Sequence, residues 1–182
     1  MVTKLRKRDS GIVNLKKLVY LISPSEIKSS FYDDLSKVLA HGNVKFFQLR
    51  VKKIKGMRLI RIARKIRQIT NKHKVKFIIN DNYKLVSKIK ADGCHMGQLD
   101  GQLKNIKKKI KRKIFGVTCH NSLTLAKKAV NYKADYLAFG SFFKSNLKPN
   151  AKRADIKVLV KANKILKKPI VVIGGINNFN YK

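Results

Sequence analysis

The chain has 182 residues, of which 44% are hydrophobic, and this is the size and composition of one globular domain with a sizeable core. Its formal net charge is +35, but Lys and Arg are spread along the chain rather than gathered around aromatic residues, which argues against specific nucleic-acid recognition. No apolar run reaches the ~20 residues that a membrane helix needs.

The amino-terminal residues are basic and lack the apolar core and the small-residue cleavage site of a secretory signal. Cys94 and Cys119 each lie within an apolar run, where a thiol usually packs as a small hydrophobic group and neither binds metal nor forms a disulfide. We therefore expect a cytoplasmic protein with two free, buried thiols.

Short apolar segments and segments of helical periodicity alternate along the chain. The apolar segments predict seven strands, at residues 18–23, 44–49, 77–79, 93–96, 114–119, 136–139 and 170–173. The periodic segments predict six helices, at residues 26–40, 57–72, 83–90, 103–111, 122–132 and 156–166. This alternation is typical of right-handed βαβ units and of a parallel sheet.

The predicted fold class is α/β, a (β/α)8 TIM barrel that lacks the eighth βα unit in this chain. Such barrels usually take ~250 residues, and this chain ends just after the seventh predicted strand. Either the sequence is a fragment or the barrel is open between its first and seventh strands, with two unpaired edges. We divide the chain into a basic lead-in at residues 1–14 and one catalytic barrel domain at residues 15–182.

Polar residues follow six of the predicted strands, and this recurrence predicts an enzyme rather than a binding protein. They lie at residues 48–52, 80–81, 97–100, 118–120, 140–148 and 174–175. Since the carboxyl ends of parallel strands meet at one end of a barrel, these residues are expected to line one active site.

Only nine carboxylates occur in the chain, and two of them, Asp81 and Asp100, directly follow predicted strands. Two carboxylates at neighbouring strand ends suit Mg²⁺, which also takes water and substrate phosphate as ligands. Mn²⁺ suits the same ligands. The alternative is that these side chains cap helices or form surface ion pairs.

The strand period of two places Gln48, Arg50 and Lys52 on one face, with Leu49 and Val51 on the other. Arg and Lys can bind phosphate, and Gln can recognise the edge of a heterocycle. The same alternation could also mark a solvated edge. Gly174 and Gly175 follow the seventh predicted strand, where they could let the backbone approach an anion or simply form a turn.

These motifs, taken in chain order, resemble those of the thiamine phosphate synthase family. The most specific segments are residues 48–52 (QLRVK), 79–81 (IND), 92–100 (DGCHMGQLD) and 135–140 (DYLAFG), and the likeness extends from Leu18 to Ile176. The resemblance implies a TIM barrel that joins hydroxymethylpyrimidine diphosphate to hydroxyethylthiazole phosphate, forming thiamine phosphate and releasing pyrophosphate.

The resemblance also implies roles for individual residues. Residues Gln48 to Lys52 and Asn80 would hold the pyrimidine diphosphate, and Asp81 and Asp100 would bind Mg²⁺. Thr118 would keep the hydroxyl of the family's Ser, Lys148 would bind the diphosphate, and Gly175 would contact the thiazole phosphate, with Gly174 beside it among the substrate-binding residues. Arg50, Lys52 and Lys148 would be the catalytic cations.

The loop after the sixth predicted strand departs from the family pattern. Ser145 and Leu147 stand where the family has Thr, so that Leu147 offers no hydroxyl to the thiazole phosphate, and Asn146 is a candidate substitute. Two alternatives stay open. One is a thiazole tautomerase of the same fold, which would use His120; the other is a non-catalytic, basic polyanion-binding protein.

Overall fold

The computed structural model describes residues 2–4, 17–98, 103–144, 152–177 and 179–180. Its strands are β1 (Val2–Lys4), β2 (Lys17–Ile22), β3 (Val44–Leu49), β4 (Lys76–Asn80), β5 (Gly93–Met96), β6 (Ile114–His120), β7 (Tyr136–Phe139) and β8 (Ile170–Val172). Its helices are α1 (Phe31–Ala40), α2 (Gly56–Lys72), α3 (Tyr83–Lys88), α4 (Leu103–Ile110), α5 (Leu123–Asn131) and α6 (Ile156–Ile165). Helix and strand alternate from β2 onward, as predicted.

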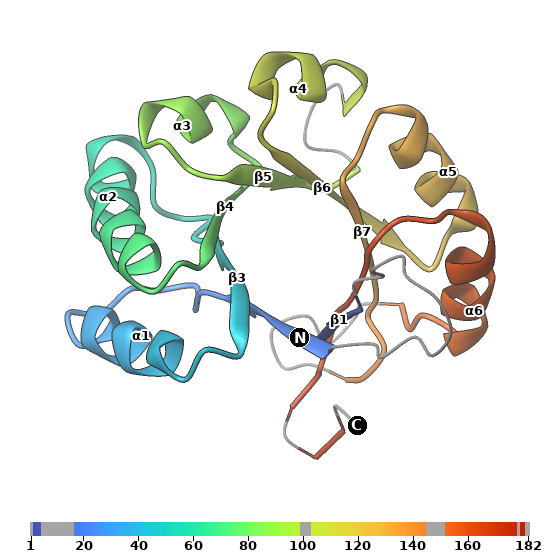
Figure 1. Cartoon of the computed structure of the whole chain (residues 1–182), viewed down its shortest axis with the longest axis horizontal. Coiled ribbons are helices and arrows are strands. Elements are labelled where there is room, and N and C mark those ends of the chain that lie inside the picture. The colour runs from blue at the N-terminus through green and yellow to red at the C-terminus, as the bar shows by residue number, and fades with distance from the viewer. Residues whose placement is uncertain (1, 5–16, 99–102, 145–151, 178, 181–182) are drawn as a thin grey trace.

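The strands form a closed barrel in chain order, with β2 to β8 paired in parallel, each to the next. Figure 1 shows the helices from α1 round to α6 as an outer layer around this ring. The parallel barrel predicted from the sequence is therefore confirmed, and the carboxyl ends of β2 to β8 lie at one end of it.

The alternative of an open barrel is wrong, because β1 closes the ring. β1 pairs antiparallel with β2 on one side and with β8 on the other, so that Val2 lies opposite both Val19 and Val172. Residues 2–4 were assigned to the basic lead-in, since three residues carry no periodicity that indicates a strand. The pairing satisfies backbone groups on the facing edges of β2 and β8 that would otherwise be open.

Two apolar layers hold the barrel together. Residues that point outward from the strands pack under the helices in one large cluster, which includes Phe47, Phe77 and Phe115. Tyr20, Ile78, Tyr136, Ala138 and Val171 form a second, smaller cluster in which alternate strand positions face inward. The barrel centre is thus packed with side chains.

The two cysteines are free and buried in the outer layer, as predicted. Burial raises the pKa of the Cys94 thiol to about 12, and it does the same for Cys119. Both thiols therefore remain protonated and unreactive at neutral pH.

Helix α1 begins later than predicted, at Phe31 rather than near residue 26. Ser29 and Ser30 lie in a turn closed by a hydrogen bond from the Phe31 N–H to the Lys28 carbonyl, and serine favours such local turns over helix. Two of the later helices begin with a side-chain cap, because Asn82 accepts a hydrogen bond from the Leu85 N–H at the start of α3 and Ser122 accepts one from the Leu125 N–H at the start of α5. Asn121 accepts a hydrogen bond from the Asp155 N–H.

Five helix ends carry lysine in the left-handed conformation that usually selects glycine. These lysines follow α2 to α6 and have φ between 44° and 64°; they are Lys74, Lys90, Lys111, Lys133 and Lys167. Only the end of α1 uses glycine, Gly42. Because lysine gives no glycine signal, the predicted ends of these helices depended on periodicity alone, and four of the five lie one or two residues beyond the observed ends.

Two aspartates fasten the amino-terminal end of the barrel. The Asp92 carboxylate, just before β5, accepts a hydrogen bond from the Phe77 N–H of β4 and forms an ion pair with Arg67 of α2. In the same way Asp135, just before β7, accepts from the Phe115 N–H of β6 and pairs with Lys107 of α4. Each aspartate therefore ties two strands and a helix together, at the end opposite the expected site.

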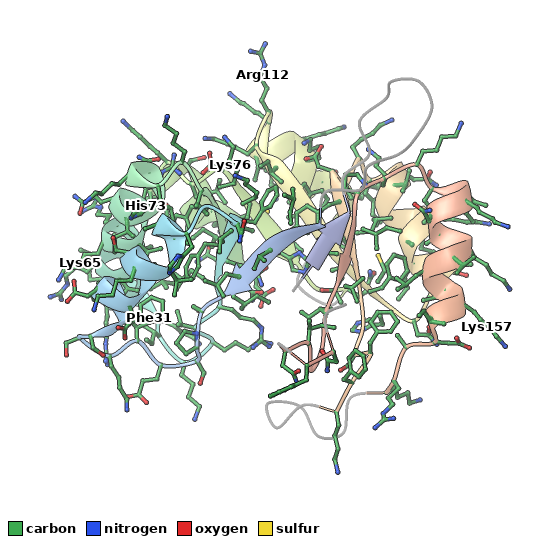
Figure 2. The ribbon with its side chains drawn as sticks, turned by 60° about the horizontal axis from the view of Figure 1, so that its bottom comes forward. Phe31, Lys65, His73, Lys76, Arg112 and Lys157 are labelled. Carbon is green, nitrogen blue, oxygen red and sulfur yellow. The ribbon has the colours of Figure 1, made fainter. Side chains whose placement is uncertain are left out.

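The outer faces of the helices carry much of the positive charge. Figure 2 shows Lys65 of α2, Lys157 of α6 and Arg112, in the turn after α4, pointing away from the barrel, and all three are exposed. This agrees with the spread of charge predicted from the sequence. Within the described parts of the chain, no helix combines the length and the apolar character needed to cross a bilayer.

Replacement of Asp92 by Ala should destabilise the barrel. The Phe77 N–H would lose its carboxylate acceptor and Arg67 its partner, so we expect the free energy of unfolding to fall by about 1–3 kcal/mol. Urea denaturation measures this change. Asp33→Ala, which removes an exposed carboxylate from the first turn of α1, should cost less than about 1 kcal/mol. Equal losses in the two variants would contradict the fastening role.

Candidate functional site

The predicted polar residues that lie within the described ranges meet at the carboxyl-terminal end of the barrel. Gln48, the second-last residue of β3, lies beside Ile78 of β4, and Asn80 ends β4 beside His95 of β5. Thr118, near the end of β6, lies beside Ala138 of β7. Neighbouring strands thus place two amides and a hydroxyl at the same end of the barrel.

The segment from Gln48 to Lys52 has the alternation expected of it. Leu49 and Val51 are buried in the outer layer, Arg50 is half-buried, Lys52 is exposed, and Gln48 is only 3% exposed. A solvated edge does not explain a buried glutamine, since a buried amide needs partners. On the inward face of this segment, Gln48 is therefore a buried polar side chain that needs hydrogen-bond partners.

Ser23, at the end of β2, fixes the backbone of this segment. Its N–H donates to the Gln48 carbonyl at 2.9 Å, and its hydroxyl accepts from the Arg50 N–H, also at 2.9 Å. These two hydrogen bonds hold the end of β3, from Gln48 to Arg50, against the end of β2. The sequence analysis did not identify Ser23, because a single serine after a strand is common in turns.

Asp81 has an unusual backbone, with φ of 60° in the left-handed region. Its N–H donates to the His95 carbonyl at 2.8 Å, which ties the turn after β4 to the end of β5. The cap of helix α3 is the neighbouring Asn82, whose side chain accepts from the Leu85 N–H. The helix-cap alternative for Asp81 is therefore wrong, and a non-glycine residue in this conformation at a strand end suggests a functional position.

A chain of buried hydrogen bonds crosses the barrel interior beneath the rim. Tyr20 Oη donates to Gln48 Oε1 at 3.2 Å and lies 2.7 Å from Tyr136 Oη. Tyr136 Oη lies 3.0 Å from His95 Nδ1, and His95 Nε2 lies 2.8 Å from Thr118 Oγ1. The two residues predicted to bind different parts of a substrate, Gln48 and Thr118, are therefore the two ends of one network.

Burial makes the phenols of Tyr20 and Tyr136 less acidic. Tyr20 is 2% exposed and Tyr136 is 5% exposed, and desolvation raises the pKa of each well above its ordinary value. Both phenols therefore keep their protons at any physiological pH, and each has one hydrogen to donate. Their rings also lie near each other, with centroids 5.7 Å apart.

The sequence analysis missed Tyr20, His95 and Tyr136 as site residues, and it placed Gln98 among the polar residues of the site without giving it a role. Gln98 donates from its amide to the Thr118 carbonyl and so holds the end of β6. Tyr20 and Tyr136 lie at inward positions of apolar strands, where an aromatic residue suggests packing. A signal was nevertheless available, because buried tyrosines usually find a hydrogen-bond partner.

Gly116 makes room for this network on β6. A Cβ atom there would lie 1.9 Å from Cζ of Tyr136, which is closer than any real contact. The absence of a side chain on β6 is thus what lets the phenol of β7 reach across the barrel.

Gly174 and Gly175 lie after β8 and are packed against the loop that follows β7. A Cβ at Gly174 would meet Ser141 Oγ at 2.0 Å, and one at Gly175 would meet the Lys144 carbonyl oxygen at 2.5 Å. Both have positive φ, of 99° and 66°. The loop therefore requires glycine here, whatever these residues do for a ligand.

His120 ends β6 after a register shift between Thr118 and His120, and its side chain is exposed. Its φ of 52° and this irregularity separate it from the buried network. Asp100 and residues 145–148, including Lys148, lie outside the described residues. Within the described part of the chain, no cluster of three or more His, Cys, Asp or Glu side chains could hold a metal ion.

Comparison with known proteins gives consistent findings. Residues 19–182 match the family model described as thiamine monophosphate synthase. The chain is 54% identical to the thiamine-phosphate synthase of Pelagibacter ubique, over 92% of this chain and 81% of that protein. It is 38% identical to that of Erythrobacter litoralis, over 89% of this chain and 78% of the relative.

A solved structure agrees with these findings. The thiamine phosphate pyrophosphorylase of Pyrococcus furiosus superimposes with a TM-score of 0.79 at 28% identity. The match covers 91% of this chain and 78% of that one. The likeness therefore holds for the backbone as well as for the sequence.

Substitution of Gly116 by Ala should displace Tyr136 and break the buried chain. We expect a loss of about 1–3 kcal/mol in the free energy of unfolding, which is the usual cost of overpacking a core. Thermal and urea denaturation measure it. Gly42→Ala is the control, because Gly42 has positive φ but open space around it, so it should show only the cost of backbone strain, about 1 kcal/mol. A neutral Gly116→Ala would show that the Tyr136 ring moves freely.

Proposed function

Because this chain belongs to the thiamine monophosphate synthase family, we propose that it joins hydroxymethylpyrimidine diphosphate to hydroxyethylthiazole phosphate. The products are thiamine phosphate and pyrophosphate, so the chain acts as a thiamine-phosphate synthase in thiamine biosynthesis. The structural observation that best supports this reaction is the position of Gln48, Asp81 and Thr118 at the carboxyl-terminal ends of β3, β4 and β6, at one end of the barrel.

The reaction needs charge neutralisation and alignment more than acid or base catalysis. Departure of the diphosphate leaves a cation on the methylene carbon, which the electron-rich aminopyrimidine ring stabilises. The thiazole nitrogen is already a nucleophile and needs no deprotonation. The protein's tasks are therefore to neutralise the leaving group and to hold the two rings in line, which positioned charges in a closed site do well.

Cations at the rim suit the leaving diphosphate. We assign the catalytic role to Arg50, Lys52 and Lys148, which would bind and neutralise it. The proposed substrate-binding residues are Gln48, Leu49, Arg50, Val51, Lys52, Asn80, Thr118, Ser145, Asn146, Leu147, Lys148, Gly174 and Gly175. We assign recognition of the pyrimidine to Gln48, because it is buried and its amide carries both donor and acceptor groups.

We assign Mg²⁺ as cofactor to Asp81 and Asp100. Asp81 fits this role, because its carboxylate follows β4 on the same rim as Thr118 and the capping of α3 falls to Asn82. Carboxylate oxygens are ligands that Mg²⁺ accepts, and Mn²⁺ would accept them too. The bound ion would supply charge neutralisation to the diphosphate.

The other functions suggested by the sequence have less support. A tautomerase would depend on His120, which is exposed at the end of β6, and the relatives compared above are synthases. The polyanion-binding alternative has the net charge in its favour, but exposed cations on helices such as Lys65 and Lys157 mark no single surface. We propose that the catalytic domain consists of residues 15–182 together with β1, because β1 closes the barrel. We propose the cytoplasm as its location, where the free thiols would persist.

The activity itself can be tested directly. The purified protein, given both substrates and Mg²⁺, should form thiamine phosphate, and EDTA should stop the reaction. Asp81→Asn removes a metal-binding charge and is expected to lower turnover at least about 100-fold. Its thermal unfolding should change little.

Asp33→Asn provides the control for that variant, because Asp33 is an exposed carboxylate on α1. It should retain wild-type turnover and the same dependence on Mg²⁺. Unchanged turnover in Asp81→Asn would remove Asp81 from the metal site. Absence of product with the wild-type protein would contradict the proposed reaction.

Lys148→Ala should weaken binding of hydroxymethylpyrimidine diphosphate. Loss of a charge-assisted contact with the diphosphate predicts a rise in the dissociation constant equivalent to about 1–3 kcal/mol. Isothermal titration calorimetry measures it. Lys144→Ala, an exposed lysine in the same connection between β7 and α6, is the matched control and should bind normally. Equal effects in both variants would indicate only a general loss of positive charge.

A further inference from the structure

Ser23 extends the ladder between β2 and β3 with its side chain rather than with its backbone. The Ser23 N–H donates to the Gln48 carbonyl, in register with the pairing of Ile22 and Gln48. One further step of a parallel ladder would offer the Arg50 N–H the backbone carbonyl of Ser23. Instead, the Ser23 hydroxyl accepts this N–H at 2.9 Å. A side chain therefore sets the position of the first residue after β3.

The residue that follows Ser23 explains why a side chain takes this place. Pro24 has a fixed φ and no N–H, so the chain leaves the sheet directly after Ser23. The Ser23 hydroxyl donates to the Pro24 carbonyl at 3.0 Å, so its one hydrogen is used within the protein. Ser23 is also buried. Its influence on a ligand must therefore pass through the residues that it holds.

Arg50 is the residue that this hydroxyl holds. Strand alternation places Arg50 on the same side as Gln48, whose buried side chain accepts from Tyr20. Arg50 is half-buried, whereas the next cation, Lys52, is exposed. Val51, which lies between the two cations, is buried in the outer layer and anchors the chain there. A guanidinium binds phosphate oxygens through a rigid planar set of donors, so its contribution depends on where the backbone places it.

We propose that Ser23 is a positioning residue for the diphosphate half of the site, and that its hydroxyl holds Arg50 where the guanidinium meets the leaving diphosphate. This inference rests on the proposed function, because it takes Arg50 as a diphosphate contact. Ser23 itself touches no substrate. Its bond to the Gln48 carbonyl is made by the backbone N–H, so loss of the hydroxyl should act on Arg50 and leave Gln48 in place.

Pyrophosphate is the probe for this role, because it carries the diphosphate half of the substrate without the pyrimidine. Its dissociation constant, with Mg²⁺ present, is measured by calorimetry. Ser23→Ala should raise this constant about 3-fold to 10-fold, since the Arg50 N–H loses its acceptor and the guanidinium its fixed place. Ser23→Thr keeps the hydroxyl and should bind to within about 2-fold of the wild type.

A double-mutant cycle tests whether Ser23 acts through Arg50. Arg50→Ala alone should weaken pyrophosphate binding at least about 10-fold. In that background Ser23→Ala should add less than about 2-fold, because the group that it positions is gone. Lys52→Ala is the matched background, since it removes a cation two residues further on, beyond the buried Val51. There Ser23→Ala should keep its full effect.

Ser122→Ala is the control for a merely structural loss. The Ser122 hydroxyl also accepts a backbone N–H, that of Leu125 at the start of α5, but it holds no proposed substrate contact. Its replacement should lower the temperature of thermal unfolding and leave pyrophosphate binding unchanged. Ser23→Cys, which fills the same space with a weak acceptor, replaces Ser23→Ala if that variant does not fold.

Turnover gives a second measurement. Ser23→Ala should lower kcat, because Arg50 is assigned to the leaving diphosphate. The KM for hydroxyethylthiazole phosphate should stay at the wild-type value, because that substrate is not assigned to Arg50. A rise in this KM with unchanged kcat would contradict the positioning role.

The possible results separate this inference from the proposed function. Failure of the wild type to bind pyrophosphate, or normal binding by Arg50→Ala, would contradict the proposed site and this inference with it. Normal binding by Ser23→Ala would overturn the inference alone and leave the site assignment standing. An effect of Ser23→Ala that persists when Arg50 is replaced, or that vanishes when Lys52 is replaced, would overturn it as well.

Discussion

The burial of two tyrosines at the centre of a small barrel is the constraint on which the site depends. Tyr20 and Tyr136 fill space that the converging strands must exclude from water, and each brings a hydroxyl that cannot be left unpaired. The pairing found joins them to Gln48 and His95. One arrangement of side chains therefore both fills the barrel interior and provides hydrogen-bond partners for its hydroxyl groups.

The two ends of the barrel have different tasks. At the amino-terminal end, Asp92 and Asp135 fasten pairs of strands to the helices outside them, which serves stability. At the carboxyl-terminal end, Ser23 and the Asp81 backbone fix where polar side chains emerge. This division is the one expected of parallel barrels, whose active sites form where the strands end. It explains why aspartates in this chain have such different surroundings.

Periodicity predicted much of this architecture because parallel strands and their helices have distinct apolar patterns. β3, β5 and β7 begin and end where the sequence analysis placed them, since a short apolar run bounded by charged or glycine residues has clear limits. Helix ends were less exact, because lysine rather than glycine adopts the left-handed conformation after α2 to α6. The strand β1 could not be predicted, because three residues show no periodicity. They form a strand only through their pairing with the edges of β2 and β8.

The sequence by itself determined the fold class, the rim of polar residues and the family, because these follow from local patterns and motif order. It could not show that Tyr20, Tyr136 and His95 connect Gln48 with Thr118, since residues up to 116 positions apart meet only when the barrel closes. The tertiary structure decided this connection, and it also assigned the α3 cap to Asn82 rather than to Asp81. The physical reason is that hydrogen-bond partners are chosen by distance in space, which the linear pattern of a strand does not contain.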